Sequence, residues 1–244
     1  MEILIFILGL IIGSFLNVCI YRIPKNKSII NPPSTCGSCG EKLGFLDLVP
    51  LLSYIFLKGK CRHCGERISL RYPLVEIITG LIFLYIYIIN GLNLLLLKFF
   101  VQASILIVVS FIDLEYQIIP DKIVAFALIT GITLNIFTKD VGAFSSLLGL
   151  AVGGGTLLII AIISGGAMGG GDIKLMGAMG AFLGLRAAVL ALLISFILGG
   201  IIGLLLIVFK IKSRKDYIPF GPFLALGTII AMLFYDEIII WYLL

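Results

Sequence analysis

The chain has 244 residues, of which 61% are hydrophobic and only 13% are charged, and its formal net charge is +5. Soluble domains carry roughly 45–50% apolar and about 25% charged residues, so the composition excludes a soluble globular protein and indicates an integral membrane protein. Nothing in the sequence resembles a nucleic-acid-binding module, and no nucleic-acid partner is expected.

Eight apolar runs are predicted to be transmembrane helices. A helix needs about 20 mostly apolar residues to cross the hydrocarbon layer of a bilayer. The runs occupy residues 3–21, 74–89, 92–112, 118–137, 141–164, 173–185, 187–209 and 218–244, and the second and sixth are short. The predicted fold class is therefore an all-α polytopic membrane protein of about eight transmembrane helices, with a small zinc-binding cytoplasmic insert between helices 1 and 2.

The distribution of basic residues predicts the orientation in the membrane. With eight crossings, 15 of the 18 Lys and Arg residues fall on one side, and the other side holds only Lys98, Lys139 and Arg186. By the positive-inside rule the first side faces the cytoplasm, so both termini are predicted to lie outside the cytoplasmic (inner) membrane. No small-residue cleavage site follows the first run, which is therefore predicted to be a retained helix and not a removed signal peptide.

This topology divides the chain into three predicted domains. They are a transmembrane helix at residues 1–21, a cytoplasmic cysteine-rich domain at 22–73, and a transmembrane domain of helices 2 to 8 at 74–244. The excess of basic residues in the second domain predicts contact with anionic membrane lipid. Docking of an acidic partner or an anionic cofactor on this surface is the alternative.

Two CxxC pairs lie in the predicted cytoplasmic insert. The first is Cys36 and Cys39 in CGSCG, and the second is Cys61 and Cys64 in CRHCG. Pairs at about this spacing are typical of a four-thiolate zinc site, and a cytoplasmic location disfavours structural disulfides. Because four thiolates close the coordination sphere, the predicted zinc is structural. A redox-active dithiol and a vacant site remain alternatives.

Acidic residues at the ends of the apolar runs are candidates for function, because ionisable groups in or against a bilayer are costly. Asp172 follows three glycines in GGGDIKL, and Asp113 ends the third run on the same predicted side. Glycines leave room for the close approach of an extended peptide. Two aspartates that share a proton could activate water and polarise a peptide carbonyl. For Asp172 alone, a helix N-cap is the structural alternative.

An ordered set of motifs resembles the type IV prepilin peptidases, which are membrane-embedded aspartic proteases of the GxGD class. The resemblance covers nearly the whole chain. It is carried by the two CxxC pairs and by GSFLNV at 13–18, GKC at 59–61, RYPLVE at 71–76, DLEYQIIPD at 113–121, GGGDIKL at 169–175 and IPFGPF at 218–223.

The resemblance implies an endopeptidase that removes the basic leader of type IV prepilins and pseudopilins, the subunits of type IV pili and type II secretion systems. The cut falls after a glycine at the cytoplasmic face, and the new N-terminal residue is then methylated with S-adenosylmethionine. The resemblance implies that Asp113 and Asp172 form the proteolytic dyad with water as the nucleophile, and it nominates Gly59 and Lys60 for binding the methyl donor.

Two functions from other classes remain as alternatives. One is a small ion- or proton-coupled transporter with a zinc-stapled cytoplasmic domain, since broken glycine-rich helices are common in transporters. The clustering of the acids at one membrane face, not at the midplane, argues against it. The other is a membrane scaffold whose cysteine domain recruits partners, but a scaffold leaves the glycine-flanked Asp172 without a role.

Overall fold

The computed structural model describes residues 1–166, 168–213 and 216–243. Two of the basic residues used for orientation, Arg214 and Lys215, and the last residue of the eighth predicted run lie outside the described residues. Within these ranges the chain is helical, and its β structure consists of two isolated bridges, Thr35 with Lys42 and Lys60 with Arg67. The predicted all-α fold class is confirmed.

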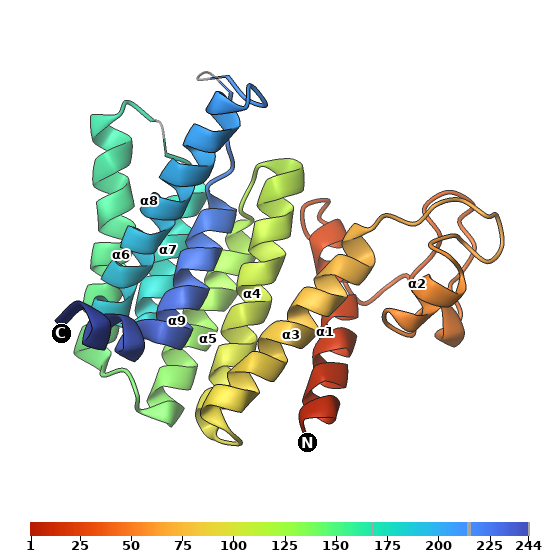
Figure 1. The fold of residues 1–244 in the computed structure, drawn as a ribbon, viewed down its shortest axis with the longest axis horizontal. Coiled ribbons are helices and arrows are strands. Elements are labelled where there is room, and N and C mark those ends of the chain that lie inside the picture. Colours follow the sequence, from red (N-terminus) through yellow and green to blue (C-terminus); the bar gives the residue numbers. More distant parts are fainter. Residues whose placement is uncertain (167, 214–215, 244) are drawn as a thin grey trace. The chain divides into compact units, whose positions relative to one another are not determined.

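The elements follow one another with short connections except in the insert after the first helix and between α8 and α9, which residues 209–220 connect (Figure 1). They are α1 (Glu2–Arg22), the 3-10 helix η1 (Phe45–Asp47), α2 (Leu52–Phe56), α3 (Arg71–Asn90), α4 (Leu94–Tyr116), α5 (Asp121–Thr138), α6 (Ala143–Ile163), α7 (Gly170–Leu183), α8 (Leu185–Val208) and α9 (Gly221–Leu243).

Among the described residues, seven helices are long and apolar enough to cross a membrane, namely α1, α3, α4, α5, α6, α8 and α9. The sixth predicted run forms α7, which has only 14 residues. At 1.5 Å per residue α7 is about 21 Å long, shorter than the roughly 30 Å hydrocarbon layer. The second run, which looked short, is a full helix of 20 residues because it begins at Arg71, before Pro73.

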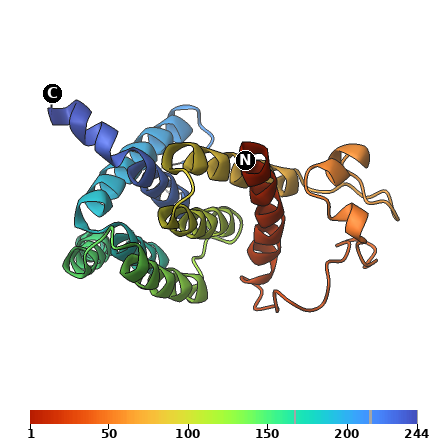
Figure 2. The same cartoon turned by 90° about the horizontal axis from the view of Figure 1, so that it is seen from below.

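The chain forms two compact units, residues 1–96 and residues 97–244. In the first unit α1 packs against α3 through glycines. A Cβ on Gly9 would lie 2.6 Å from the Cα of Gly80, and a Cβ on Gly13 would lie 2.7 Å from the Cα of Glu76. Small residues let helix backbones approach this closely in membranes. The insert extends to one side of the α1–α3 pair (Figure 2). The division into domains at residues 21 and 73 stays a prediction.

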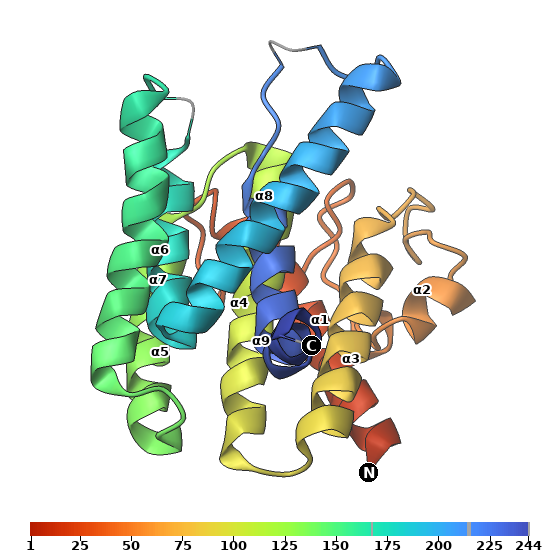
Figure 3. The same cartoon turned by 60° about the vertical axis from the view of Figure 1, so that its left-hand side comes forward.

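In the second unit α6 and α7 lie side by side (Figure 3). A Cβ on Gly153 of α6 would lie 2.6 Å from the carbonyl oxygen of Met176. A Cβ on Gly149 would lie even closer to the carbonyl oxygen of Gly180. The backbones of the two helices are therefore in direct contact, with no side chains between them along this line.

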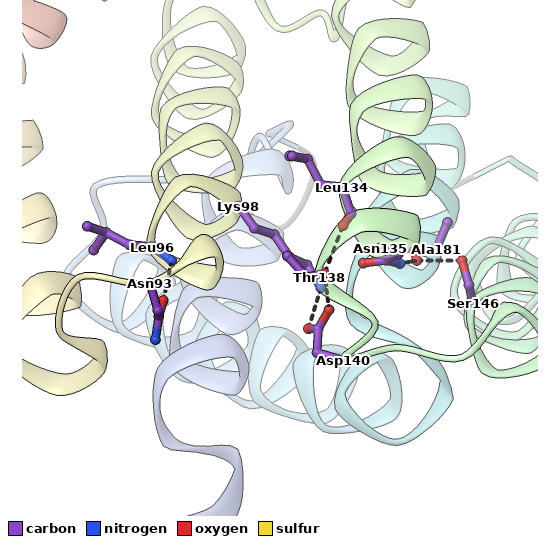
Figure 4. Close-up of polar contacts among 9 residues, drawn as sticks. All are labelled: Asn93, Leu96, Lys98, Leu134, Asn135, Thr138, Asp140, Ser146 and Ala181. Carbon is purple, nitrogen blue, oxygen red and sulfur yellow. Dashed lines mark hydrogen bonds and ion pairs between the residues drawn. The ribbon is translucent and has the colours of Figure 1, made fainter.

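The C-terminal end of α7 is held by two side chains (Figure 4). The Asn135 amide of α5 and the Ser146 hydroxyl of α6 both donate hydrogen bonds to the carbonyl oxygen of Ala181, at 2.9 Å and 2.7 Å. The last carbonyls of a helix lack partners within the helix, so these two donors satisfy a group that would otherwise be buried and unpaired. Close by, the Lys98 ammonium pairs with Asp140 at 2.6 Å.

Candidate active site and metal centre

Asp113 lies in the last turn of α4 and is buried. Its Oδ2 accepts a hydrogen bond of 2.9 Å from the backbone N–H of Gly221, the first residue of α9. A Cβ on Gly221 would lie 2.7 Å from that oxygen, so a glycine is needed for the contact. The N-terminal end of a helix also favours negative charge. The start of α9 thus fixes the position of the Asp113 carboxylate.

Asp172 is the third residue of α7 and is also buried. The N-cap of α7 is Gly169, whose backbone N–H donates to the Asp172 carboxylate. The N-cap alternative for Asp172 is therefore wrong, because the carboxylate reaches back from the first turn of the helix. Within the described part of the chain, its Oδ1 is buried and has no hydrogen-bond partner.

Tyr217, in the connection between α8 and α9, lies near both carboxylates. A Cβ on Gly169 would lie 2.8 Å from Oδ2 of Asp172 and 3.8 Å from the Tyr217 hydroxyl oxygen. Burial, followed by the negative charges of Asp172 and Asp113, raises the pKa of Tyr217 above its usual value. The charge of Asp113 also acts on Asp172. The structure therefore brings together two aspartates that are far apart in the sequence.

The segment 217–221 is the part of this site that sequence patterns do not predict in detail. Its Tyr217 end lies near Asp172, and its Gly221 end holds Asp113. The available signal is the IPFGPF motif, which marks the start of α9, but it does not indicate the contact with Asp113 or the role of the tyrosine before it.

The remaining acids near the ends of helices have other surroundings. Asp121 is exposed and pairs with Lys174 at 2.8 Å, and Glu115 is exposed. Glu76 belongs to the first unit, where its Oε2 accepts a hydrogen bond of 2.8 Å from the backbone N–H of Leu51 in the insert. In the second unit, Asp113 and Asp172 are thus distinguished by burial and by their approach to each other.

The four cysteines of the insert converge, as their spacing predicts. Their Sγ atoms all lie within 4.8 Å of one another, and those of Cys36 and Cys64 are 3.9 Å apart. A tetrahedral zinc with Zn–S bonds of about 2.3 Å separates its sulfur ligands by roughly 3.8 Å. The cluster therefore has the size and the donor set of a four-thiolate metal site.

Each CxxC pair folds in the same way. The backbone N–H of the glycine after the pair donates to the carbonyl of the first cysteine, from Gly40 to Cys36 and from Gly65 to Cys61, both at 3.0 Å. Both glycines have a positive φ, 72° and 73°, which a glycine adopts without strain. The N–H groups of Cys39 and Ser38 lower the pKa of Cys36 to about 6, which favours the thiolate that binds metals.

Gly59 and Lys60 lie just before the second pair. Gly59 is buried with a φ of 68°, and a Cβ there would lie 2.8 Å from the hydroxyl oxygen of Tyr54. Lys60 is exposed. Their predicted role in binding S-adenosylmethionine stays a prediction, although the contact with Tyr54 gives a physical reason for a glycine at position 59.

The fold and the two sites define a polytopic helical membrane protein with a buried pair of aspartates and a separate four-cysteine cluster. Two family models match the chain: the bacterial peptidase A24 N-terminal domain over residues 7–89, and the type IV leader peptidase family over residues 99–204. The chain belongs to the type IV leader peptidase family.

Similar proteins named prepilin leader peptidase/N-methyltransferase extend over the whole chain. The protein from Bacillus subtilis (strain 168) is 37% identical over 98% of this chain and 97% of its own length. Those from Legionella pneumophila and Aeromonas hydrophila are 35% and 34% identical, over 100% and 98% of this chain and over 94% and 93% of their own lengths. No solved structure matches.

Proposed function

We propose that the protein is an aspartic endopeptidase that removes the basic leader of type IV prepilins and pseudopilins after a glycine, at the cytoplasmic face of the inner membrane. The observation that carries this proposal is the convergence of Asp113 and Asp172 on segment 217–221. Membership in a leader peptidase family supports it over the transporter. The proposal includes the predicted orientation, with both termini outside.

In the proposed mechanism the two aspartates share one proton. The ionised carboxylate takes a proton from water, and the water oxygen attacks the carbonyl carbon of the scissile bond. The protonated carboxyl donates to the carbonyl oxygen, and no covalent intermediate forms. The carboxyl that took the proton from water then passes it to the amide nitrogen, the C–N bond breaks, and the hydroxyl proton returns to the other aspartate as the new carboxyl group forms. The Gly221 N–H fixes Asp113 for this task, since it holds Oδ2 at 2.9 Å.

We also propose that the Tyr217 hydroxyl, which lies near both carboxylates, donates a hydrogen bond to the oxygen that becomes negative in the transition state. A phenol ordinarily has a pKa of about 10 and burial raises that of Tyr217 further, so the phenol keeps its proton at neutral pH. Tyr217→Phe retains the ring and removes this donor, so kcat should fall on the order of 100-fold while KM changes little. Steady-state cleavage kinetics test this, with Tyr235→Phe in α9 as the control. An unchanged kcat would exclude a chemical role for the hydroxyl.

The direct test of the proposed function uses the purified protein in lipid nanodiscs and a prepilin that carries a Gly–Phe junction. We expect cleavage between these two residues, read by mass spectrometry. A prepilin that stays intact, or that is cut only elsewhere, would contradict the peptidase assignment. The same spectrum shows whether the product carries an added methyl group.

We further propose that the protein methylates the new N-terminal amine. When bound, S-adenosylmethionine would supply the methyl group for the neutral amine nitrogen, with S-adenosylhomocysteine as the leaving group and the amine proton released to water. The relatives are named as methyltransferases as well as peptidases, which supports this second activity. The pilin segment that follows the cut is then the substrate of both reactions.

We propose zinc as the metal of the cysteine cluster, with a structural role. Cys61→Ser should lower the bound zinc from one equivalent per chain to near zero, since a structural zinc site needs its four ligands. Amide hydrogen exchange within residues 22–73 should rise, because the metal contributes to the folding of small domains. Cys19→Ala, which removes the buried thiol of α1 outside the cluster, should keep the zinc. Full zinc content in Cys61→Ser would contradict the site.

A further inference from the structure

The cysteine insert exposes large apolar side chains although it lies outside the membrane-spanning helices. Five of them belong to the two short helices of the insert, η1 and α2, which contact each other. They are Phe45 and Leu46 of η1, which are 85% and 67% exposed, and Leu52, Ile55 and Phe56 of α2, which are 52%, 58% and 80% exposed. These five residues form the apolar ridge. Exposed apolar patches mark sites of interaction with proteins or membranes.

The part of the ridge that lies on α2 is one face of that helix. Leu52, Ile55 and Phe56 recur at the spacing i, i+3 and i+4, which places them on the same side. Tyr54 points the other way, because its hydroxyl donates a hydrogen bond of 3.2 Å to the carbonyl of Ile68 within the insert. The helix therefore packs its tyrosine inward and presents its apolar face outward, the reverse of an amphipathic helix on a soluble domain.

A hydrogen bond fixes the position of the ridge along α3. The backbone N–H of Leu51, directly before α2, donates to Oε2 of the buried Glu76 at 2.8 Å. Helix α3 begins at Arg71, so at 1.5 Å per residue Glu76 lies about 7.5 Å along the helix from its start. Helix α2 accordingly lies beside the pair of α1 and α3 and not beyond their ends (Figures 1 and 3).

Basic residues at the ends of α1 and α3 mark the level of the membrane surface in this unit. Arg22 ends α1 and Arg71 begins α3, and both helices are long and apolar enough to cross a membrane. Arginine and lysine side chains near helix ends extend toward the headgroups. The contact of Leu51 with α3 lies about 7.5 Å below this level. Interfacial helices bury their apolar face by about 5–10 Å, so the ridge begins at the depth that such helices occupy.

The charge of the insert complements an anionic membrane surface. Residues 22–72 contain nine Lys and Arg residues and only three acidic residues. Lys42, which precedes the ridge by three residues, and Lys58, which follows it by two, are both exposed. Interfacial helices combine basic residues with Phe and Leu in this way, and basic segments are attracted to anionic lipid. A bilayer beside the spanning helices matches both the apolar ridge and its basic flanks.

We propose that the apolar ridge inserts into the bilayer leaflet on the side of the insert, while Lys42 and Lys58 contact anionic headgroups. In the proposed orientation this is the cytoplasmic leaflet. The inference goes beyond the two proposed activities and depends on neither. The ridge then forms a third membrane contact of the first unit, besides α1 and α3. Because Glu76 joins the spanning helix α3 to the inserted helix α2, the cysteine cluster is held at a fixed height on the bilayer.

The test places a tryptophan in the ridge of the whole protein. The chain has a single tryptophan, Trp241, so Phe56→Trp is combined with Trp241→Phe in nanodiscs that contain anionic phosphatidylglycerol. We expect the emission of position 56 to lie at shorter wavelengths than in the unfolded protein and to be quenched by brominated lipid. Bromine near the glycerol end of the acyl chain should quench more than bromine near the methyl end, because interfacial insertion is about 5–10 Å deep.

Tyr54→Trp in the same background is the matched control, because position 54 lies on the opposite face of α2. Brominated lipid should quench it much less than position 56, and equal quenching at the two positions would contradict an oriented ridge. Emission of position 56 at the wavelength of the unfolded protein would overturn the proposal. Emission at short wavelengths that bromine does not quench would also overturn it, since protein, for example a second copy of the chain, would then cover the ridge.

The contribution of the basic residues is tested through the charge of the lipid. Quenching at position 56 should be stronger in discs with phosphatidylglycerol than in discs of phosphatidylcholine alone, because anionic headgroups attract the lysines. The added changes Lys42→Gln and Lys58→Gln should remove this difference. Equal quenching in the two lipids before these changes would overturn the role of the headgroup charge.

Photoreactive lipid gives a measurement on the protein without any substitution. A phospholipid that carries a diazirine near the glycerol end of its acyl chain should label peptides that span residues 45–56. Absence of label from these peptides, in a sample where α1 and α3 are labelled, would overturn the proposal.

Discussion

Asp172→Asn is expected to lower kcat for leader cleavage by about 100- to 10,000-fold, the range that one general acid or base contributes. Asparagine has nearly the same shape but cannot take up or release a proton near neutral pH. Asp113→Asn should have an effect of the same size. The double variant should be hardly worse than either single one, because residues that act as a unit are not additive. Initial rates on a purified prepilin measure all three.

A matched control for these variants is Asp121→Asn. Asp121 starts α5, has a side chain that is 74% exposed, and pairs with Lys174 on the helix that carries Asp172. Exposed ion pairs contribute little, so this variant should cleave at close to the wild-type rate. Loss of activity in Asp121→Asn, or its retention in Asp172→Asn, would show that the buried pair is not the dyad.

In the ion pair between Lys98 and Asp140, replacing Asp140 should cost more unfolding free energy than replacing Lys98. The side chain of Lys98 is 2% exposed, whereas that of Asp140 is 26% exposed. Asp140→Asn leaves a buried ammonium unpaired and should cost about 3–5 kcal/mol of unfolding free energy. Lys98→Met leaves only a carboxylate that is partly exposed and keeps its hydrogen bond from Thr138, and it should cost about 1 kcal/mol. Denaturant titration in detergent measures both.

The double variant Lys98→Met, Asp140→Asn provides the control for this pair. With both charges removed, no ion is left buried, and most of the stability lost in Asp140→Asn should return. Equal losses in the two single variants, or a double variant as unstable as Asp140→Asn, would contradict the asymmetry.

The stabilisation by Asp140 should also depend on pH. Burial opposes its ionisation, but hydrogen bonds from Lys98 and Thr138 outweigh burial and lower the pKa of Asp140. A carboxyl whose pKa is lower in the folded state stabilises above its unfolded pKa, about 3.9, and loses this effect as the pH falls through the folded value. The stability gap between wild type and Asp140→Asn should therefore be constant from about pH 5 to 8 and shrink below about pH 4.

Hydrophobic runs predict most of this fold because lipid exposure demands long apolar helices. The hydrophobic runs do not predict the length of α7. The apolar composition continues beyond this helix, but the helix itself is bounded by Gly169 and by Gly184, which has a φ of 79°. The hydrophobic runs also place the start of α3 too late. Pro73 marks the apparent boundary, yet proline is tolerated in the first turn of a helix, where its missing N–H has no partner to lose.

The two sites differ in how far the sequence predicts them. The cysteine cluster is predictable because each CxxC pair is a local motif with its own glycine turn. A single contact between the two pairs then completes the site. The approach of Asp113 to Asp172 depends on contacts between distant segments, such as that with Gly221. Nothing in the sequence distinguishes Tyr217 from any other tyrosine that precedes a helix. Its position near the two aspartates is visible only in the folded structure.

The backbone contact between α6 and α7 has a consequence for how the protein can adapt. Because glycines of the two helices touch, α7 has no layer of side chains that could compress or slide, and its far end is pinned at Ala181. Lipid-facing residues can therefore change to suit bilayers of different thickness or fluidity without altering the depth of the acid at the other end. Selectivity among prepilin substrates therefore has to be determined by residues outside the α6–α7 contact, where the sequence is freer to vary.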